Sequence, residues 1–262
     1  MSSWLNNSQE RKLLAKTLHE KHRKAKNKED AANITAEAQK IDNVWKTACE
    51  DGKHNGKVHL CWINLKNVSD RIYTFQSDYG RELQELVLDG IGLSCLGEIC
   101  NQLTHLKSLS LASNNIKCIS DIGNLRGLTR LNLLRNNLTH LPASIGILTN
   151  LTRLDLANNK LTQLPEEFGH LSKLRYLNLE ANELCELPLS FGNLRCEVVN
   201  LNSNCFAVFP DCVLGMPNLK QWSIMANELI DLPVGIGRMK NLEIFRASKN
   251  RIMIVPDSIV NL

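Results

Sequence analysis

Aromatic residues and long apolar runs are both scarce in this chain. Phenylalanine, tryptophan and tyrosine make up 5% of the 262 residues, which is few for a compact core built around large rings. No stretch of about 18 apolar residues without a charge occurs, so the sequence predicts no transmembrane segment. The first residues, Met-Ser-Ser-Trp-Leu-Asn-Asn, do not read as a basic segment followed by an apolar one, and we expect no secretory signal.

Catalytic and cofactor-binding motifs are also missing. The sequence contains no phosphate-binding glycine loop, no G-x-S-x-G and no H-E-x-x-H, the patterns that build a phosphate cradle, a nucleophilic serine or a pair of zinc ligands. We therefore expect no catalytic residues, no cofactor and no enzymatic activity. Cys95, Cys118 and His140 fall at equivalent positions of the repeat described below, but a straight column of ligands suits tetrahedral zinc poorly, and we expect no metal site.

The nine cysteines are an odd number and accompany no secretory signal. Unpaired thiols are typical of a reducing compartment. We expect the chain in the cytoplasm, with the nucleus or the cytoskeleton as alternatives. Cys196 takes the place of an apolar repeat residue, and we interpret it as a small buried core group.

Charge divides the chain in two. Residues 1–57 carry twelve lysines and arginines against eight acidic residues, whereas residues 58–262 carry nineteen of each. We interpret residues 1–57 as a basic helical arm and cap, and residues 58–262 as the folded body. In the arm, Ile34, Ala38 and Trp45 share one helical face, and we expect that face to cover the first repeats.

The basic residues of the arm offer one possible binding surface. They are Arg11, Lys12, Lys16, Lys21, Arg23, Lys24, Lys26 and Lys28. The simplest interpretation is a solvated helix, and the alternative is contact with an anionic membrane or an acidic protein. Few aromatics interleave with these residues and no zinc or RNA-binding signature is present, so we do not expect nucleic-acid binding.

The body is built from a repeat rich in leucine (43 residues in the chain) and asparagine (29). The segment 151–161, Leu-Thr-Arg-Leu-Asp-Leu-Ala-Asn-Asn-Lys-Leu, recurs at steps of 22 or 23 residues, from starts at 60, 83, 106, 128, 151, 174, 196, 219 and 242. Leu154 and Leu156 alternate with Asp155, which predicts a short strand with the leucines inward. A period of this length is the leucine-rich-repeat signature. It predicts an α/β right-handed solenoid of about nine repeats, the last one incomplete, with a curved parallel sheet on the concave face and short helical or 3-10 turns on the convex face.

An asparagine follows each strand at a fixed position. An amide at such a turn can both donate to and accept from backbone groups that would otherwise be buried without a partner. We expect a structural asparagine ladder made of Asn114, Asn136, Asn159, Asn182, Asn204, Asn227 and Asn250.

The second half of each repeat carries an apolar-Pro pair and then an apolar-Gly pair, as in Leu141-Pro142 and Ile145-Gly146. Proline pre-sets φ and lacks the N–H that a first helical residue does not need. We expect each proline at the first position of a convex helical turn. Ile259 and Leu262 match Ile145 and Leu148, so the sequence stops within such a turn.

The outward positions of the strands form a candidate partner-binding strip. Its members on the concave face are Arg130, Asn132, Arg135, Arg153, Asp155, Tyr176, Asn178, Glu180, Met225 and Ile244. Tyrosine and arginine are common interface hot spots. Arg130 and Arg153 lie one repeat apart, so we expect their guanidinium groups to straddle one carboxylate or phosphate, while Asp155 and Glu180 orient a basic group of the same partner.

With its L-P-x-x-I-G-x-L-x-x-L segments, the chain resembles intracellular leucine-rich-repeat proteins of the Ras-suppressor and Shoc-type scaffold class. Its layout is similar to striated-muscle members such as myomasin, which have a charged helical region and a strand-like lead-in resembling Gly56-Lys-Val-His-Leu. The resemblance implies a non-enzymatic scaffold and carries no partner identity.

Two functions follow from these patterns. The first is a non-enzymatic intracellular scaffold that binds a partner protein on the concave face. The alternative is a targeting or anchoring module in which the basic arm binds an anionic surface. The salt dependence of binding distinguishes the two functions. Binding through the basic arm should weaken steeply with ionic strength, whereas binding on the concave face, which has an apolar component, should not.

Overall fold

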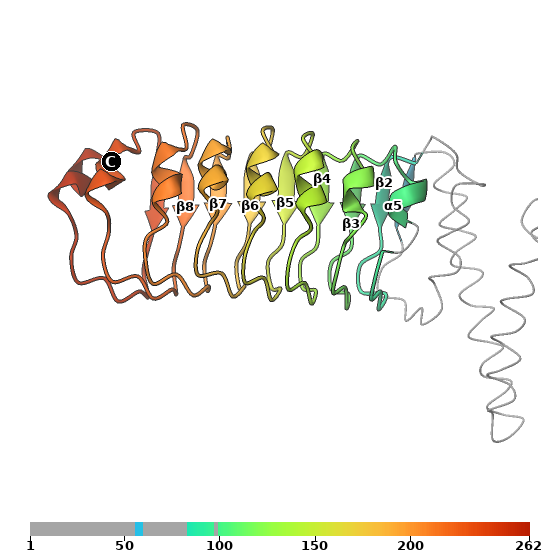
Figure 1. The fold of residues 1–262 in the computed structure, drawn as a ribbon, viewed down its shortest axis with the longest axis horizontal. Helices are drawn as coiled ribbons and strands as arrows, with labels where there is room; N and C mark the ends of the chain where they lie inside the picture. The colour runs from blue at the N-terminus through green and yellow to red at the C-terminus, as the bar shows by residue number, and fades with distance from the viewer. Residues whose placement is uncertain (1–55, 60–82, 97–98) are drawn as a thin grey trace, which may run out of the picture. The chain divides into compact units, whose positions relative to one another are not determined.

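The structure, a computed structural model, describes residues 56–59, 83–96 and 99–262. The basic arm, its eight cationic residues and the expected capping face lie outside this part of the chain. In the described part the chain repeats a short strand followed by a short helix on the opposite side, and Figure 1 shows these units side by side in sequence order.

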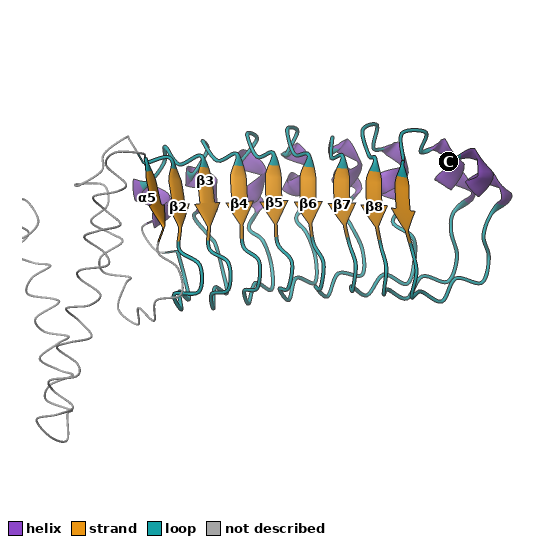
Figure 2. Cartoon of the chain, turned by 180° about the vertical axis from the view of Figure 1, so that it is seen from behind, coloured by secondary structure: helices purple, strands orange, loops and turns teal. Residues whose placement is uncertain are grey.

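The strands form one nine-stranded parallel sheet in the order of the sequence, as Figure 2 shows from the strand side. They are β1 (Lys57–His59), β2 (Glu85–Val87), β3 (Ser108–Ser110), β4 (Arg130–Asn132), β5 (Arg153–Asp155), β6 (Tyr176–Asn178), β7 (Val198–Asn200), β8 (Gln221–Ser223) and β9 (Ile244–Arg246). Each repeat places its strand in the same register, so that Leu131 pairs with Leu154 and Leu154 with Leu177.

The core is a stack of equivalent apolar side chains. Leu131, Leu154 and Leu177 are each at most 1% exposed, because the middle residue of a three-residue strand points away from the outward pair. Trp222 takes the same position on β8 and is also buried. Cys196 is buried as expected, and that burial raises the pKa of its thiol to about 12.

The strand next to β2 differs from the expectation. The repeat frame that starts at residue 60 predicts a strand around Ile63, but the strand paired with β2 is β1, with Val58 opposite Leu86. Val58 is fully buried, so it fills the core position that the frame gives to Ile63. Residues 60–82 lie outside the described part of the chain. The strand-like lead-in implied by the resemblance is confirmed, and the pairing of the residue-60 repeat with β2 is wrong.

Short helices line the side of the solenoid opposite the strands. They are α5 (Ile99–Gln102) and the 3-10 helices η2 (Ile122–Asn124), η3 (Ala143–Ile147), η4 (Glu166–His170), η5 (Leu189–Asn193), η6 (Asp211–Gly215), η7 (Val234–Arg238) and η8 (Asp257–Asn261). Six of the seven prolines, Pro142 for example, stand one position before a 3-10 helix in an extended conformation, rather than at the first helical position. None of the helices in the described residues has the length and apolar character needed to cross a membrane.

In η2 to η5 and in η7, one glycine of the convex turn is required by close packing against the next repeat. A Cβ atom on Gly146 would collide with the backbone of Glu167, and one on Gly169 with the backbone of Ser190. These glycines let the backbones of neighbouring helices approach, while apolar side chains such as Phe168 and Phe191 stack between them.

The asparagine ladder is confirmed. Asn159, 8% exposed, donates from Nδ2 to the carbonyls of Leu133 (2.9 Å) and Leu156 (3.0 Å) and accepts at Oδ1 from the N–H of Leu138 (3.0 Å). The same pattern recurs at the other six positions of the ladder. Each amide joins its own turn to the preceding repeat, which satisfies groups that the strand pairing leaves unpaired.

A left-handed residue precedes every rung of the ladder. Seven non-glycine residues have φ between 53° and 59°, namely Ser113, Arg135, Asn158, Ala181, Ser203, Ala226 and Lys249. Except at Lys249, their N–H groups donate to the next repeat, as Asn158 does to the carbonyl of Glu180 at 2.8 Å. The conformation costs an L-residue about 1–2 kcal/mol, and these bonds hold it in place.

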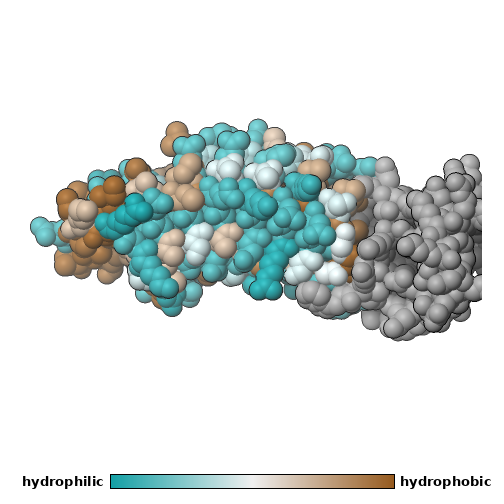
Figure 3. Space-filling model, turned by 90° about the horizontal axis from the view of Figure 1, so that it is seen from below, coloured by the Kyte–Doolittle hydropathy of each residue, from teal (hydrophilic) through white to brown (hydrophobic). Residues whose placement is uncertain are grey.

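Apolar side chains reach the surface mainly at the C-terminal end of the described chain. Val234, Met253 and Val260 are between 79% and 83% exposed, and Figure 3 shows apolar residues gathered at that end, while the surface over the middle repeats is largely hydrophilic.

Candidate binding surface on the sheet face

The outward side chains of β4 to β9 form two columns that we call the sheet face. The first column is Arg130, Arg153, Tyr176, Val198, Gln221 and Ile244, and the second is Asn132, Asp155, Asn178, Asn200, Ser223 and Arg246. The structure thus brings most of the predicted partner-binding residues onto one surface. Glu180 and Met225 follow in a third position beyond the strands, and Arg135 lies in the left-handed turn after β4.

Arg153 and Tyr176 form a stacked pair at the centre of the sheet face. The guanidinium carbon of Arg153 lies 3.9 Å from the centroid of the Tyr176 ring, within the range of a cation–π contact. Burial, reinforced by the nearby carboxylate of Asp155, raises the pKa of the Tyr176 hydroxyl, which keeps it a neutral hydrogen-bond donor. Arg153 thus contacts β6, on the side of β5 opposite to β4, the strand that carries Arg130.

The second column has a structural role that the sequence analysis missed. Asn132, Asp155 and Asn178 each accept at Oδ1 from the N–H two residues further on, at 3.1 to 3.2 Å. Such turns are favoured by asparagine and aspartate. They satisfy a backbone N–H just beyond the end of each strand, and the recurrence of Asn or Asp at this position was the signal for them.

Where the second column holds serine, a neighbour supplies the missing acceptor. Ser223, and Ser110 at the equivalent position of β3, direct their hydroxyls to the preceding repeat instead. Asp89 accepts from Ala112 N–H at 2.8 Å, and Asn202 accepts from Met225 N–H at 2.8 Å, and each also accepts from the adjacent serine hydroxyl at 2.7 Å. The backbone polar group is therefore satisfied in both kinds of repeat.

The carboxylates of the sheet face are engaged by its own amides. Asp155 Oδ2 accepts from Asn178 Nδ2 at 3.4 Å, and Glu180 Oε2 accepts from Asn200 Nδ2 at 2.9 Å. These bonds neutralise no charge, but they fix both groups in the surface.

The arginines on and beside the sheet face differ from its carboxylates, because their guanidinium groups make no hydrogen bonds or ion pairs among the described residues. Among the described residues, ion pairs join Lys57 and His59 to Glu85, Arg175 and Lys220 to Glu197, and Arg251 to Glu228. None of the ion pairs or hydrogen bonds in this part of the chain involves the guanidinium groups of Arg130, Arg135, Arg153 or Arg246, and all four residues are exposed. Arg130, Arg153 and Arg246 on the sheet face, and Arg135 beside it, therefore have guanidinium donors available to a partner.

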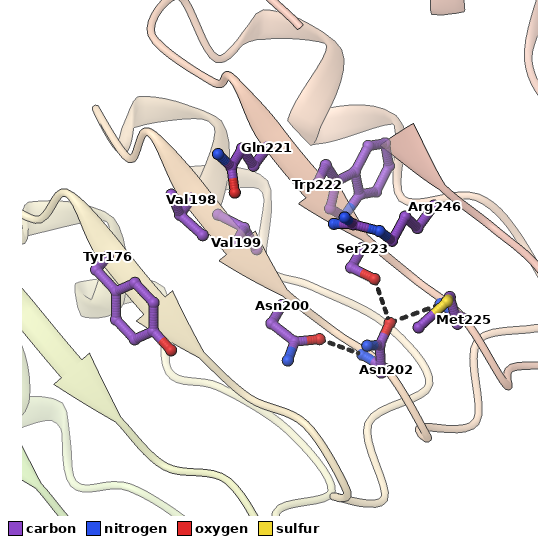
Figure 4. A pocket seen from close by; sticks show the side chains of 10 residues that line it. All are labelled: Tyr176, Val198, Val199, Asn200, Asn202, Gln221, Trp222, Ser223, Met225 and Arg246. Carbon is purple, nitrogen blue, oxygen red and sulfur yellow. Dashed lines mark hydrogen bonds between the residues drawn. The ribbon is translucent and has the colours of Figure 1, made fainter. Parts of the chain in front are cut away.

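A hollow of about 260 Å³ lies beside the stacked pair, over β6 to β9. Its lining includes Tyr176, Val198, Gln221, Met225 and Arg246, and Figure 4 shows Arg246 reaching from β9 toward β8. At its lower edge Asn202 Oδ1 accepts from the hydroxyl of Ser223 and from the N–H of Met225. Ile244, also predicted for the strip, is half-buried on β9 and does not line the hollow.

Potential metal ligands and free thiols are scattered over the described residues. No group of three potential ligands stands ready for a metal ion among them. Burial raises the pKa of the Cys100 thiol to about 12 and that of Cys212 to about 11, so these thiols stay protonated. Cys95, Cys118, Cys185 and Cys205 are exposed and free.

Comparison with known proteins agrees with this geometry. The family model described as leucine rich repeat matches residues 126–184, which include three strands of the sheet, β4 to β6. A solved leucine-rich-repeat protein of Leptospira interrogans is 26% identical with a TM-score of 0.52, over 79% of this chain and 64% of that one. The chain has the leucine-rich-repeat fold.

Two further solved structures are plant receptors with bound factors. The leucine-rich-repeat ectodomain of the receptor kinase GASSHO1/SCHENGEN3 from Arabidopsis thaliana, in complex with Casparian strip integrity factor 2, is 28% identical with a TM-score of 0.62, over 69% of this chain and 23% of that one. The plant peptide hormone receptor RGFR1, in complex with RGF2, is 28% identical with a TM-score of 0.57, over 72% and 36%. This leucine-rich-repeat protein spans less than two thirds of the length of each of these structures. No curated protein matches it.

Proposed function

We propose that this leucine-rich-repeat protein is a non-enzymatic interaction scaffold that binds a partner polypeptide on its sheet face. The observation that carries the proposal is a set of exposed arginines, three on the sheet face and Arg135 beside it, whose guanidinium groups have no ion-pair or hydrogen-bond partner among the described residues. Partner groups would complete the hydrogen bonding of these arginines. The sheet fixes the backbone that carries them, and stacking on Tyr176 restrains Arg153, which lowers the entropic cost of binding.

The structural neighbours support a polypeptide partner. Two receptors with the same fold are complexes with named factors, one of them a peptide hormone receptor. A solenoid has one extended face for such a ligand. The Arg153–Tyr176 pair contributes an arginine and an aromatic ring at the centre of this face, the residue types that most often dominate binding energy.

The proposed setting is intracellular. All seven cysteines in the described residues are free thiols, and four of them are exposed. Exposed free thiols persist where the compartment is reducing. The resemblance to Ras-suppressor and Shoc-type scaffolds and to striated-muscle members agrees with this setting.

Capture from a cell extract by two charge-reversed variants tests the proposal. Arg130→Glu with Arg153→Glu should abolish capture of the partner and leave the protein folded, since both side chains are exposed and the change removes only the stacking of Arg153 on Tyr176, worth about 0.5–1 kcal/mol. The matched control is Arg126→Glu with Arg238→Glu, which makes the same charge change at two exposed arginines outside the sheet face. Capture that survives the first double variant but is lost on removing residues 1–28 would overturn the proposal in favour of the anchoring alternative.

A further inference from the structure

We infer that the partner segment is an extended acidic peptide whose apolar side chain occupies the hollow over β6 to β9. The inference rests on the proposed function and gives the partner a chemistry. It predicts two acidic residues that flank one apolar residue at a defined spacing.

The charge of the peptide follows from which groups on the sheet face have partners. Asp155 and Glu180 accept hydrogen bonds from Asn178 and Asn200, whereas Arg153 and Arg246 have no charged or hydrogen-bonding partner among the described residues. A carboxylate brought to a free guanidinium gains a charge-assisted hydrogen bond. A basic group brought to this face would meet carboxylates that are already engaged, together with arginines that repel it.

The apolar residue of the peptide follows from the lining of the hollow. Val198 and Met225 are half-buried apolar side chains on either side of it, and the ring of Tyr176 closes one end. Asn202 Oδ1 accepts from the hydroxyl of Ser223 and from the N–H of Met225 (Figure 4), so this oxygen needs no hydrogen bond from a ligand. The side-chain amide of Gln221 has no hydrogen-bond partner among the described residues and is available to a peptide backbone group.

The spacing follows from the sheet. Arg153 on β5 and Arg246 on β9 are four strands apart, about 19 Å at the usual distance between strands. An extended peptide that crosses the strands covers this distance in about six residues. Alternate side chains of an extended peptide point to one side, so acidic residues at positions 1 and 7 both face the sheet. The facing residue at position 5 falls between β7 and β8, over the hollow, and the pattern is acidic-x-x-x-apolar-x-acidic.

Selection from a random peptide library displayed on phage tests the inference with the full chain as target. Peptides with the acidic-x-x-x-apolar-x-acidic pattern should be enriched. Their affinity, measured by fluorescence anisotropy with the synthetic peptide, should fall at least about tenfold in Arg246→Glu and roughly fivefold in Val198→Ser. The matched controls are Arg238→Glu and Val208→Ser, at exposed residues outside the sheet face, and thermal melts verify that all four variants are folded.

The outcomes separate the two proposals. Enriched peptides that lack the pattern but lose binding in the Arg130→Glu, Arg153→Glu double variant would overturn the acidic-peptide inference and leave the scaffold function standing. Enriched peptides that bind equally well to every sheet-face variant would overturn both. Failure to enrich any peptide would contradict the inference, because a preformed site of this kind must select its own ligand from a random library.

Discussion

Arg153 and Tyr176 face each other on adjacent strands, with the guanidinium carbon 3.9 Å from the ring centroid. Each restrains the other without using up the hydrogen-bond donors of the guanidinium, since a cation–π contact acts through the face of the group. The pair therefore presents a pre-oriented charge beside a flat apolar surface. We consider it the centre of the binding surface.

The ladder predicts a sharp contrast between two neighbouring asparagines. Asn159→Ala removes four hydrogen bonds of a buried amide and should lower the free energy of unfolding by about 1–3 kcal/mol. Asn158→Ala should cost much less, because Asn158 is exposed and alanine occupies the equivalent left-handed position at residue 181. Urea midpoints of the two variants measure the difference, and equal midpoints would remove the ladder as a source of stability.

The register predicts opposite tolerance at two consecutive residues of β5. Leu154→Asp places an unpaired charge in the leucine stack and should cost more than about 3 kcal/mol. Asp155→Leu should cost about 1 kcal/mol, because it removes the acceptor for the N–H of Ala157, and Asp155→Asn should restore most of the loss. Thermal unfolding followed by circular dichroism ranks the three variants, and Asp155→Leu as the least stable would show that the register is wrong.

Because Ala181 lies in a left-handed turn, replacing it with glycine should stabilise the protein. Ala181 has φ of 54°, a conformation that glycine adopts without steric cost. After the loss of chain entropy, Ala181→Gly should gain about 0.5 kcal/mol. Ala143→Gly is the control, since Ala143 begins η3 with an ordinary backbone and the change should cost about 0.5–1 kcal/mol there. Urea midpoints that shift in the same direction for both variants would contradict the assignment of φ.

Much of the fold could be predicted because its determinants are local in sequence. The alternation of leucines set the strands, and the asparagine spacing set the ladder. The left-handed turn could not be predicted, since its occupants include serine, arginine, alanine and lysine, and the conformation is imposed by bonds to the next repeat. The contact between Arg153 and Tyr176 depends on which way a long side chain leans, and no repeat pattern encodes that direction. The position beside β2 was predicted for Ile63 and is taken by Val58. Both residues fit the apolar pattern, so the pattern alone could not tell which of them pairs with β2.

Six of the seven cysteines in the described residues fall into two reactivity classes. Cys100 and Cys196 are buried, and the pKa of each thiol is raised to about 12, so almost none of the reactive thiolate exists at pH 8. Cys95, Cys118, Cys185 and Cys205 are exposed. Brief iodoacetamide treatment followed by peptide mass spectrometry should label these four in the native protein and Cys100 and Cys196 only after addition of urea. Native labelling of Cys196 would contradict its burial in the leucine stack.

Site-directed photo-crosslinking tests the central claim most directly, that the sheet face contacts the partner. A benzoylphenylalanine placed at Gln221, beside the hollow, should form a covalent adduct with the captured polypeptide on irradiation. The same residue placed at Leu189 on η5, which is 84% exposed on the opposite side, should form none. Adducts from position 189 and none from position 221 would contradict the account and move the binding surface to the helices.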